Sequence, residues 1–335
     1  MKRHIYVILF TLISFVFCSN IMATPVNLLD LSHDSGFADV ICTAKMQSYE
    51  FGSKDASKMV SISIVYIVDR VIKGDINPGD QLTIGTKQQG LYGRHIVSGY
   101  DLLLLKRDGA RYIFALDSLS TMPVAEEVHL SYSKSSDTHA NLRWEIINSL
   151  QDLSFQIVRE ALRQVTILSA NDVVRYVRPL ISNPDISIHA YALAACVKAG
   201  DQQMFSTALD FIFRQYEEKP NNYTESGFGM LRSELMSAKI PPDQISAIGD
   251  RIKSTSIIVR QLASYLLMKS ESLDAASYLK SSLDDTDFEV RHQAVMGLAF
   301  ALHDYEHCPS IAKFKANESE YLNYWKNKDI KDIAK

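Results

Sequence analysis

Polar and apolar residues alternate between about residues 38 and 118, with the period of two that is expected of β-strands. The pattern predicts five strands, over residues 38–45, 60–72, 81–86, 101–106 and 110–116. The second is long for one strand, so a bend or bulge is expected inside it. Turn signals lie at Pro78-Gly79-Asp80 and at Asp108-Gly109, the latter typical of a two-residue hairpin. Together these features predict a small antiparallel sheet that curls into a barrel-like domain.

From residue 138 onward, the apolar residues follow the three- and four-residue steps of helices instead. One such stripe runs from Leu142 to Val165, and a break near 150–154 divides it into two helices. Further helices are predicted over residues 170–182, 187–199, 202–217, 223–238, 243–252, 256–269, 272–282 and 287–302. Their short connections indicate antiparallel neighbours, and starts such as Asp285-Thr286-Asp287 fit N-terminal caps. The fold class is therefore predicted as β then α, in two domains.

A short pattern occurs three times in the helical half. Its copies share one spacing: Ile188-His189 before Ala192, Val259-Arg260 before Ala263, and Val290-Arg291 before Ala294. The second and third copies are 31 residues apart, and the first precedes the second by 71, about two periods. A fixed period in this range is typical of stacked helical hairpins that share one core. In such a stack the valine and alanine face the neighbouring helix, and the arginine can reach carboxylates or carbonyls of the adjacent turn.

The first residues are predicted to be a secretory signal peptide. Lys2 and Arg3 precede an apolar run from Ile5 to Cys18, and Met22-Ala23 provides a small residue for cleavage. The run is shorter than the ~20 residues that a spanning helix needs. We therefore expect a secreted or periplasmic protein with no stable membrane insertion after cleavage. The predicted organisation is a signal peptide at 1–23, a barrel-like domain at 24–122, a linker at 123–137, helical repeats at 138–308, and an aromatic-rich cap and tail at 309–335.

Charge and cysteine content narrow the function classes. The chain has 35 Lys and Arg residues against 39 Asp and Glu, without a basic cluster, which argues against nucleic-acid binding. Three cysteines follow the signal segment, namely Cys42, Cys196 and Cys308, and an odd number leaves at least one thiol unpaired. Disulfides are therefore not the organising principle, although Cys196 and Cys308 can form a bridge if their helices pack together.

The repeated segments resemble HEAT repeats, whose second helix commonly opens after an Asp-containing turn with Val-Arg and an Ala four positions after the Val. Residues 285–294 are the closest copy, whereas the copy at 254–263 lacks the Asp and the first copy has His189 in place of Arg. The resemblance covers roughly residues 170–305. It implies an α-α superhelix that exposes a long surface for protein partners.

A second resemblance concerns the β half. The strand around Ala38-Asp39-Val40, the strand ending in Lys73-Gly74-Asp75, the Pro-Gly-Asp turn and the strand at Tyr100-Asp101 follow one another in order. This order is similar to the small oligonucleotide-binding-type barrel of secreted bacterial proteins, which in turn resembles the inhibitory domain of tissue inhibitors of metalloproteinases. Those inhibitors begin with closely spaced cysteines, whereas this segment has only Cys42.

Two groups of residues are candidates for a site. Tyr92, Arg94 and His95 lie in a long loop between strands, and Tyr and Arg are enriched where proteins bind each other. The alternative for this loop is a connector of no special role. His303, His307 and Cys308 lie within six residues, and two histidines four apart on one helix face can bind zinc with a cysteine as third ligand. The alternative here is a polar helix end before Pro309.

The sequence favours an exported protein that binds another protein through its helical repeats. No catalytic signature stands out, a Gly-x-Ser-x-Gly nucleophile motif included, and a helical stack offers a large surface without a single deep pocket. A non-enzymatic role without a cofactor is therefore expected. One alternative is a secreted inhibitor or neutralising protein that acts through the loop at Tyr92, Arg94 and His95. The other is a metal-dependent hydrolase that uses His303 and His307.

Overall fold

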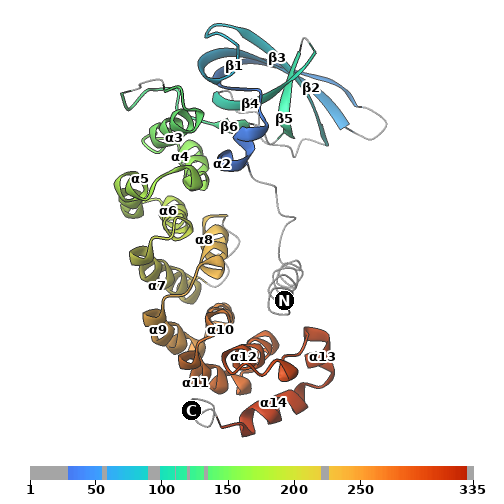
Figure 1. Cartoon of the computed structure of the whole chain (residues 1–335), viewed down its shortest axis with the longest axis vertical. Helices are drawn as coiled ribbons and strands as arrows, with labels where there is room; N and C mark the ends of the chain where they lie inside the picture. The colour runs from blue at the N-terminus through green and yellow to red at the C-terminus, as the bar shows by residue number, and fades with distance from the viewer. Residues whose placement is uncertain are drawn as a thin grey trace. The chain divides into compact units, whose positions relative to one another are not determined.

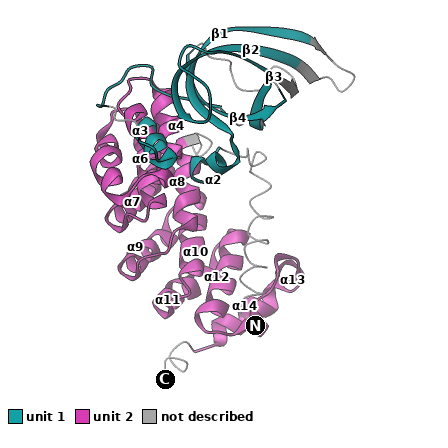
Figure 2. Ribbon diagram, turned by 45° about the horizontal axis from the view of Figure 1, so that its top comes forward, with its two compact units in different colours: residues 1–145 teal, residues 146–335 magenta. Residues whose placement is uncertain are grey.

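The computed structural model describes residues 29–54, 59–89, 99–109, 111–118, 121–131, 135–219 and 226–329. The chain divides into two compact units, Met1–Glu145 and Ile146–Lys335 (Figure 2). The first contains an antiparallel barrel-like sheet and the second consists of helices, so the predicted β-then-α fold class is confirmed. The division falls inside a helix, whereas the prediction placed a linker at 123–137. The predicted signal peptide at 1–23 lies outside the described residues.

The sheet of the first unit has six strands among the described residues. They are β1 (Val40–Lys54), β2 (Met59–Lys73), β3 (Gln81–Gln89), β4 (Tyr100–Asp108), β5 (Arg111–Ser118) and β6 (Thr121–Pro123). The strand order is β3-β2-β1-β4-β5, with β6 paired to β4, and every pair is antiparallel. The sheet curls until β3 and β5 approach each other, which nearly closes a barrel (Figure 1). A short helix, α2 (Leu31–Asp34), and a 3-10 turn, η2 (Ser35–Phe37), precede β1.

The long strands contain the irregularities that the sequence predicts. Thr43 pairs with Arg70 but Ala44 pairs with Val68, so Asp69 is an extra residue in β2. A second shift lies nearer the end of β2, and a third, at Gln47, lies in β1. Each bulge adds bend and twist to its strand, which is how fifteen-residue strands follow a small barrel. The bulge predicted within residues 60–72 is thereby confirmed.

Two features of the sheet were not predicted. β1 continues to Lys54, nine residues beyond its predicted end at Lys45, because the bulge at Gln47 interrupts the alternation there. β6 forms from residues assigned to the end of the domain and the start of the linker, and the following Val124 and Ala125 are fully buried. The predicted linker therefore begins as part of the barrel.

Twelve α-helices follow in the described part of the chain. They are α3 (Thr138–Ser149), α4 (Phe155–Arg163), α5 (Ala170–Asp172), α6 (Ile186–Lys198), α7 (Gln202–Glu218), α8 (Ser226–Ser237), α9 (Ile245–Asp250), α10 (Ile257–Ser270), α11 (Leu273–Ser281), α12 (Phe288–Ala301), α13 (Ile311–Ala316) and α14 (Glu318–Asn327). Helix α6 packs on α7 and α8, α10 packs on α9 and α12, and α11 packs on α9 and α12 (Figure 1). The break predicted near 150–154 separates α3 from α4.

Side-chain caps start several of these helices. The Asp185 carboxylate accepts hydrogen bonds from the backbone N–H groups of Ser187 and Ile188, and Asp287 accepts one from Val290. Such caps satisfy N–H groups that have no partner within the helix. One predicted helix is irregular: residues 170–182 form one α-turn, a π-helical segment and a 3-10 segment that includes Pro179. Proline has no N–H to donate, which favours the departure from regular α-helix.

One apolar core runs through the helices, and small residues allow neighbouring helices to pack closely against each other. A Cβ atom at Gly297 of α12 would lie 2.9 Å from the Cα atom of Met268 and 2.7 Å from Leu279. Phe314 and Trp325, from the segment predicted to be an aromatic cap, are fully buried in the same core. No helix in the described residues is long and apolar enough to span a membrane.

Candidate functional site

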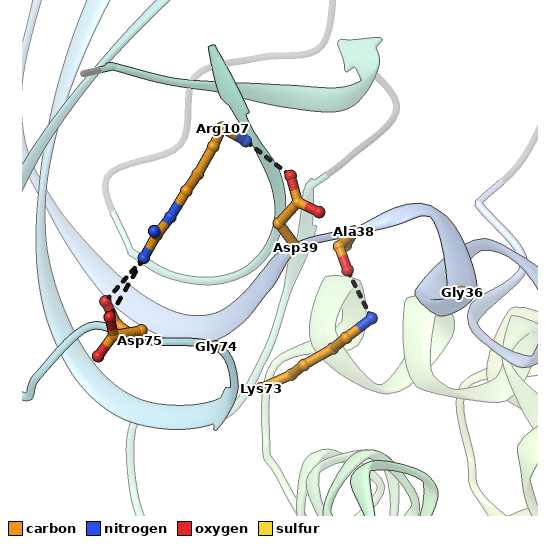
Figure 3. Close-up of a pocket in the computed structure, with 7 residues that line it drawn as sticks. All are labelled: Gly36, Ala38, Asp39, Lys73, Gly74, Asp75 and Arg107. Carbon is orange, nitrogen blue, oxygen red and sulfur yellow. Dashed lines mark hydrogen bonds and ion pairs between the residues drawn. The ribbon is translucent and has the colours of Figure 1, made fainter. Parts of the chain in front are cut away.

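A hollow opens on the barrel unit where three strand ends meet. It has a volume of about 530 Å³ and is lined by Gly36, Ala38, Asp39, Lys73, Gly74, Asp75 and Arg107 (Figure 3). The residues come from the approach to β1, from the end of β2 with its following turn, and from the end of β4. The turn belongs to the Lys73-Gly74-Asp75 segment that the sequence marks as a break between strands.

The two cations of this hollow are held by neighbouring oxygens. The Lys73 ammonium donates to the carbonyl of Ala38 at 2.5 Å (Figure 3). It also lies 3.4 Å from the carbonyl of Ser35, the first residue of the 3-10 turn. The Arg107 guanidinium donates to the Asp75 carbonyl at 3.3 Å and lies 3.6 Å from its carboxylate. The Arg107 backbone N–H donates to Asp39 at 2.9 Å.

Gly74 makes this junction compact. Its φ is +99°, which side chains other than hydrogen rarely tolerate, and a Cβ atom there would lie 2.7 Å from the Asp39 carbonyl oxygen. The close approach lets the end of β2 contact the start of β1. Since the two cations are matched by carbonyls and carboxylates, the hollow joins strand ends and offers little uncompensated charge to a ligand.

A second cluster in the barrel unit centres on Arg70, next to the bulge at Asp69. The guanidinium donates to both carboxylate oxygens of Glu145, with Nε at 2.8 Å and Nη2 at 3.0 Å, and to Asp69 at 2.7 Å. The rings of Tyr100 and Trp144 lie 5.9 and 5.8 Å from its Cζ atom. The Glu145 side chain is 1% exposed and that of Arg70 is 13% exposed.

The environment of this pair favours a structural role. Burial raises the pKa of the Glu145 carboxyl, and the hydrogen bonds and positive charge of Arg70 oppose that rise. The ion pair, which joins residues 75 apart, ties the first turns of α3 to β2 within the same unit. No sequence signal identifies this partner, because the pair joins a strand to a helix through tertiary packing.

The repeated arginines of the helical unit form a chain of contacts. Arg260 donates to both oxygens of Asp285, with Nε at 2.7 Å and Nη2 at 3.2 Å, and to the carbonyl of Ser254 at 2.9 Å. One repeat later, Arg291 donates to the Asp285 carbonyl at 2.7 Å and to Glu318 at 2.5 Å. Each arginine thus joins its own turn to the next along the stack. The small apolar positions that accompany them in the motif are fully buried: Val259, Ala263, Val290 and Ala294.

The three candidate metal ligands do not form a ligand set. Helix α12 ends at Ala301 and His303 has a φ of +54°, so His303 and His307 do not share a helix face as the metal hypothesis requires. His303 Nδ1 lies 3.3 Å from the Tyr305 hydroxyl, His307 Nδ1 lies 2.9 Å from Asp304, and the Cys308 thiol lies 3.4 Å from the sulfur of Met296. The described residues contain no group of three or more His, Cys, Asp or Glu side chains placed to hold a metal ion.

The other sequence-based candidates are placed as follows. Tyr92, Arg94 and His95 lie outside the described residues, between Gln89 at the end of β3 and Tyr100 at the start of β4. Cys42, Cys196 and Cys308 all have free thiols, so Cys196 and Cys308 are not bridged.

A feature that the sequence analysis missed lies two residues before the Val of the repeated motif. Ile186 and Ile257 occupy this equivalent position, as the first residues of α6 and α10, and are 39% and 50% exposed. The third copy has Phe288, which packs beside Phe314 with ring centroids 5.4 Å apart. The sequence signal that could have revealed this position is that all three copies have a large apolar residue there, outside the motif itself.

Comparison with known proteins adds no assignment. No protein-family model matches this chain, and no curated protein matches it significantly.

Proposed function

We propose that this chain is an exported, non-enzymatic scaffold that binds another protein through the surface of its HEAT-like helical repeats. The observation that carries the proposal is the repeated exposure of Ile186 and Ile257 at equivalent positions. A partner that contacts both would bury two β-branched side chains without deforming the stack.

The contacts behind these positions support the proposal. The Asp185 cap fixes the start of α6, and the Ser256 hydroxyl, next to Ile257, donates to the Tyr216 carbonyl at 3.1 Å. Arg260 holds the same turn against Asp285. Side chains on such fixed turns lose little further freedom when they bind, which favours affinity.

The test uses the full chain, immobilised and exposed to the exported proteins of its source. Ile186→Ser combined with Ile257→Ser should reduce the recovery of specific partners by about fivefold or more, because well-packed anchors each contribute over ~1 kcal/mol. Leu273→Ser is the matched control, since Leu273 begins α11 and is 46% exposed but lies outside the repeated position. Unchanged recovery with the double variant would exclude this surface.

A second candidate is an inhibitor that acts through the barrel. Tyr49 and Phe51 of β1 are about half exposed, with ring centroids 5.4 Å apart. Their pairing with the buried Ile64 and Ile62 places them on the core-facing side of the sheet, near its rim. Partner recovery that is lost with Tyr49→Ser and Phe51→Ser, but not with the isoleucine variants, would favour this candidate.

A further inference from the structure

The first copy of the repeated motif differs from the other two at one position. It has His189 where the second and third copies have Arg260 and Arg291. Each of these arginines donates to a carboxylate, Arg260 to Asp285 and Arg291 to Glu318. A guanidinium stays charged throughout the physiological pH range, whereas an imidazole changes its charge between about pH 5 and 8. The contact that His189 makes can therefore respond to pH, and those of the two arginines cannot.

His189 belongs to a stack of three aromatic rings from three helices. Its ring packs on that of Phe211 of α7, with centroids 4.3 Å apart and ring planes 14° from parallel. The Phe211 ring also stacks with that of Phe228 of α8, at 5.8 Å and 7°. The two phenylalanines are 4% and 1% exposed and belong to the core of the helical unit. The His189 ring is therefore part of the packing between α6, α7 and α8.

The packed position of His189 disfavours the protonated ring. Its Nε2 atom is buried and has no hydrogen-bond partner in the described part of the chain. In an imidazolium both ring nitrogens carry a proton, so this atom would be a buried donor without an acceptor. A buried donor without a partner is unfavourable, and a buried charge without a partner is more so. The geometry therefore favours a neutral imidazole as long as the ring stays packed on Phe211.

The charged groups around α6 do not compensate a positive charge on this ring. The elements that pack against α6 are α4, α7, α8 and three short segments, η3 (Val165–Ile167), η4 (Val173–Val177) and η5 (Arg178–Ser182). The charged groups that they bring toward α6 are Glu160, Arg163, Arg178, Arg214, Arg232 and Glu234; η3 has none, and Arg175 of η4 is exposed. Within the described residues, neither of the two carboxylates forms an ion pair with His189. Burial lowers the pKa of His189, and the positive charge of Arg214 lowers it further.

We propose that the packing of the start of α6 on α7, here called the α6 joint, is an acid-sensitive device: it is closed while the His189 imidazole is neutral and opens when the ring is protonated. A histidine whose pKa is lowered by folding stabilises the closed form above the ordinary pKa of about 6.5, and this contribution is lost as the pH falls below that value. Ile186, the exposed first residue of α6, lies one turn before His189 and loses its fixed position when the joint opens. Partner binding at Ile186 then weakens in acid, a consequence that rests on the proposed protein-binding function.

Hydrogen–deuterium exchange of the full chain, followed by mass spectrometry at about pH 7.5 and about pH 5.5, tests the joint directly. Opening takes up one proton, so the opening equilibrium can rise by at most about tenfold for each pH unit. After correction for the intrinsic effect of pH on exchange, peptides from α6 and α7 should lose protection by about threefold or more, within that limit. Peptides from α9, α10 and α11 contain no histidine and serve as the internal reference.

His189→Phe is the decisive variant, because it keeps an aromatic ring on Phe211 but cannot gain a proton. Its α6 and α7 peptides should be equally protected at both pH values. His189→Gln, which is smaller and also neutral, repeats the test if phenylalanine disturbs the packing. Arg214→Gln should weaken the acid response, because it removes a positive charge that disfavours the imidazolium. His292→Phe is the matched control: His292 is a partly buried histidine of α12 whose Nε2 lies 3.3 Å from the Pro309 carbonyl, and its loss should leave the response of α6 and α7 unchanged.

The proposal is overturned if α6 and α7 lose no more protection in acid than the reference peptides, or if both His189 variants respond to acid as the native protein does. These outcomes are independent of the isoleucine test, because the exchange measurement requires no partner. If exchange shows the acid response but partner recovery ignores Ile186 and Ile257, the α6 joint stands and the isoleucine surface is excluded. If recovery depends on the isoleucines but α6 is equally protected at both pH values, the scaffold stands and this inference fails.

Discussion

Two arginines, one in each unit, make nearly the same bidentate contact with a carboxylate but arise in different ways. Arg260 meets Asp285 across 25 residues, within a pattern that the chain repeats. Arg70 contacts Glu145, 75 residues later in the chain, and no repeat or residue spacing in the sequence predicts this pair. The first contact joins neighbouring turns of a stack, whereas the second joins a strand bulge to a helix. The comparison shows that similar ion-pair geometry can follow from local periodicity or from tertiary register alone.

The largest effect is expected where the partner is most deeply buried. Arg70→Met leaves the Glu145 carboxylate unpaired at 1% exposure, so the free energy of unfolding should fall by about 3–5 kcal/mol. Urea unfolding of the full chain measures this loss. Arg70→Met combined with Glu145→Gln should recover part of the stability, because no buried charge remains. Equal losses in the single and double variants would contradict a coupled pair.

The repeated contact should be weaker, since both side chains keep some access to solvent. Arg260→Met should lower the free energy of unfolding by about 2 kcal/mol, the scale of hydrogen bonds to a charged group. Arg260→Lys should recover only part of the loss, because an ammonium cannot reproduce the two-pronged contact. Chemical unfolding of the two variants, compared with Arg251→Met at a more exposed ion pair, checks this order. If Arg260→Met lowered the free energy of unfolding as much as Arg70→Met, the expected difference between the two ion pairs would be contradicted.

The smallest effect is expected at the end of the stack, where Asp304 accepts hydrogen bonds from Tyr324, His307 and Lys328. Burial raises the pKa of Asp304, but these partners outweigh it and hold the pKa well below its usual range. A carboxylate with a lowered pKa stabilises the fold above its unfolded pKa, and that contribution is lost as the pH falls towards the folded pKa.

Asp304→Asn should therefore cost roughly 1 kcal/mol near neutral pH, and the difference from the native protein should shrink below about pH 4. Melting temperatures of both proteins across acidic pH measure the effect. Lys313→Met, at an exposed helix position, serves as the control. A difference that grows as the pH falls would have the opposite sign and would contradict the stabilising role of this carboxylate.

Particular residues show where sequence-based prediction succeeded. The starts of α6, α10 and α12 were placed within a residue or two, because Asp185, Ser256 and Asp287 precede apolar residues at helical spacing. The hairpin between β4 and β5 was expected from Asp108-Gly109, and Gly109 has a φ of +61°. These signals act within a few residues, where backbone geometry and capping decide the structure.

The failures have equally specific causes. His303 and His307 are four residues apart, which would place them on one face of a helix. Helix α12 ends before both of them, so they do not share a helix face. β1 extends past a polar stretch because β2 supplies hydrogen bonds along its length, which alternation alone does not reveal. Ile186 and Ile257 have the apolar character of core residues, and only the packing shows that they are exposed.

The sequence by itself determined the change of period between the two halves, the order of most strands and helices, and the arginines Arg260 and Arg291 of the second and third copies of the repeated motif. These follow from hydrogen bonding and side-chain periodicity over short separations, which the residues encode directly. Only the tertiary structure decided that Asp69 bulges out of β2 and that Glu145 is the partner of Arg70. Those outcomes depend on the register and packing of segments far apart in the chain, where many pairings satisfy the same local rules and the whole core selects one.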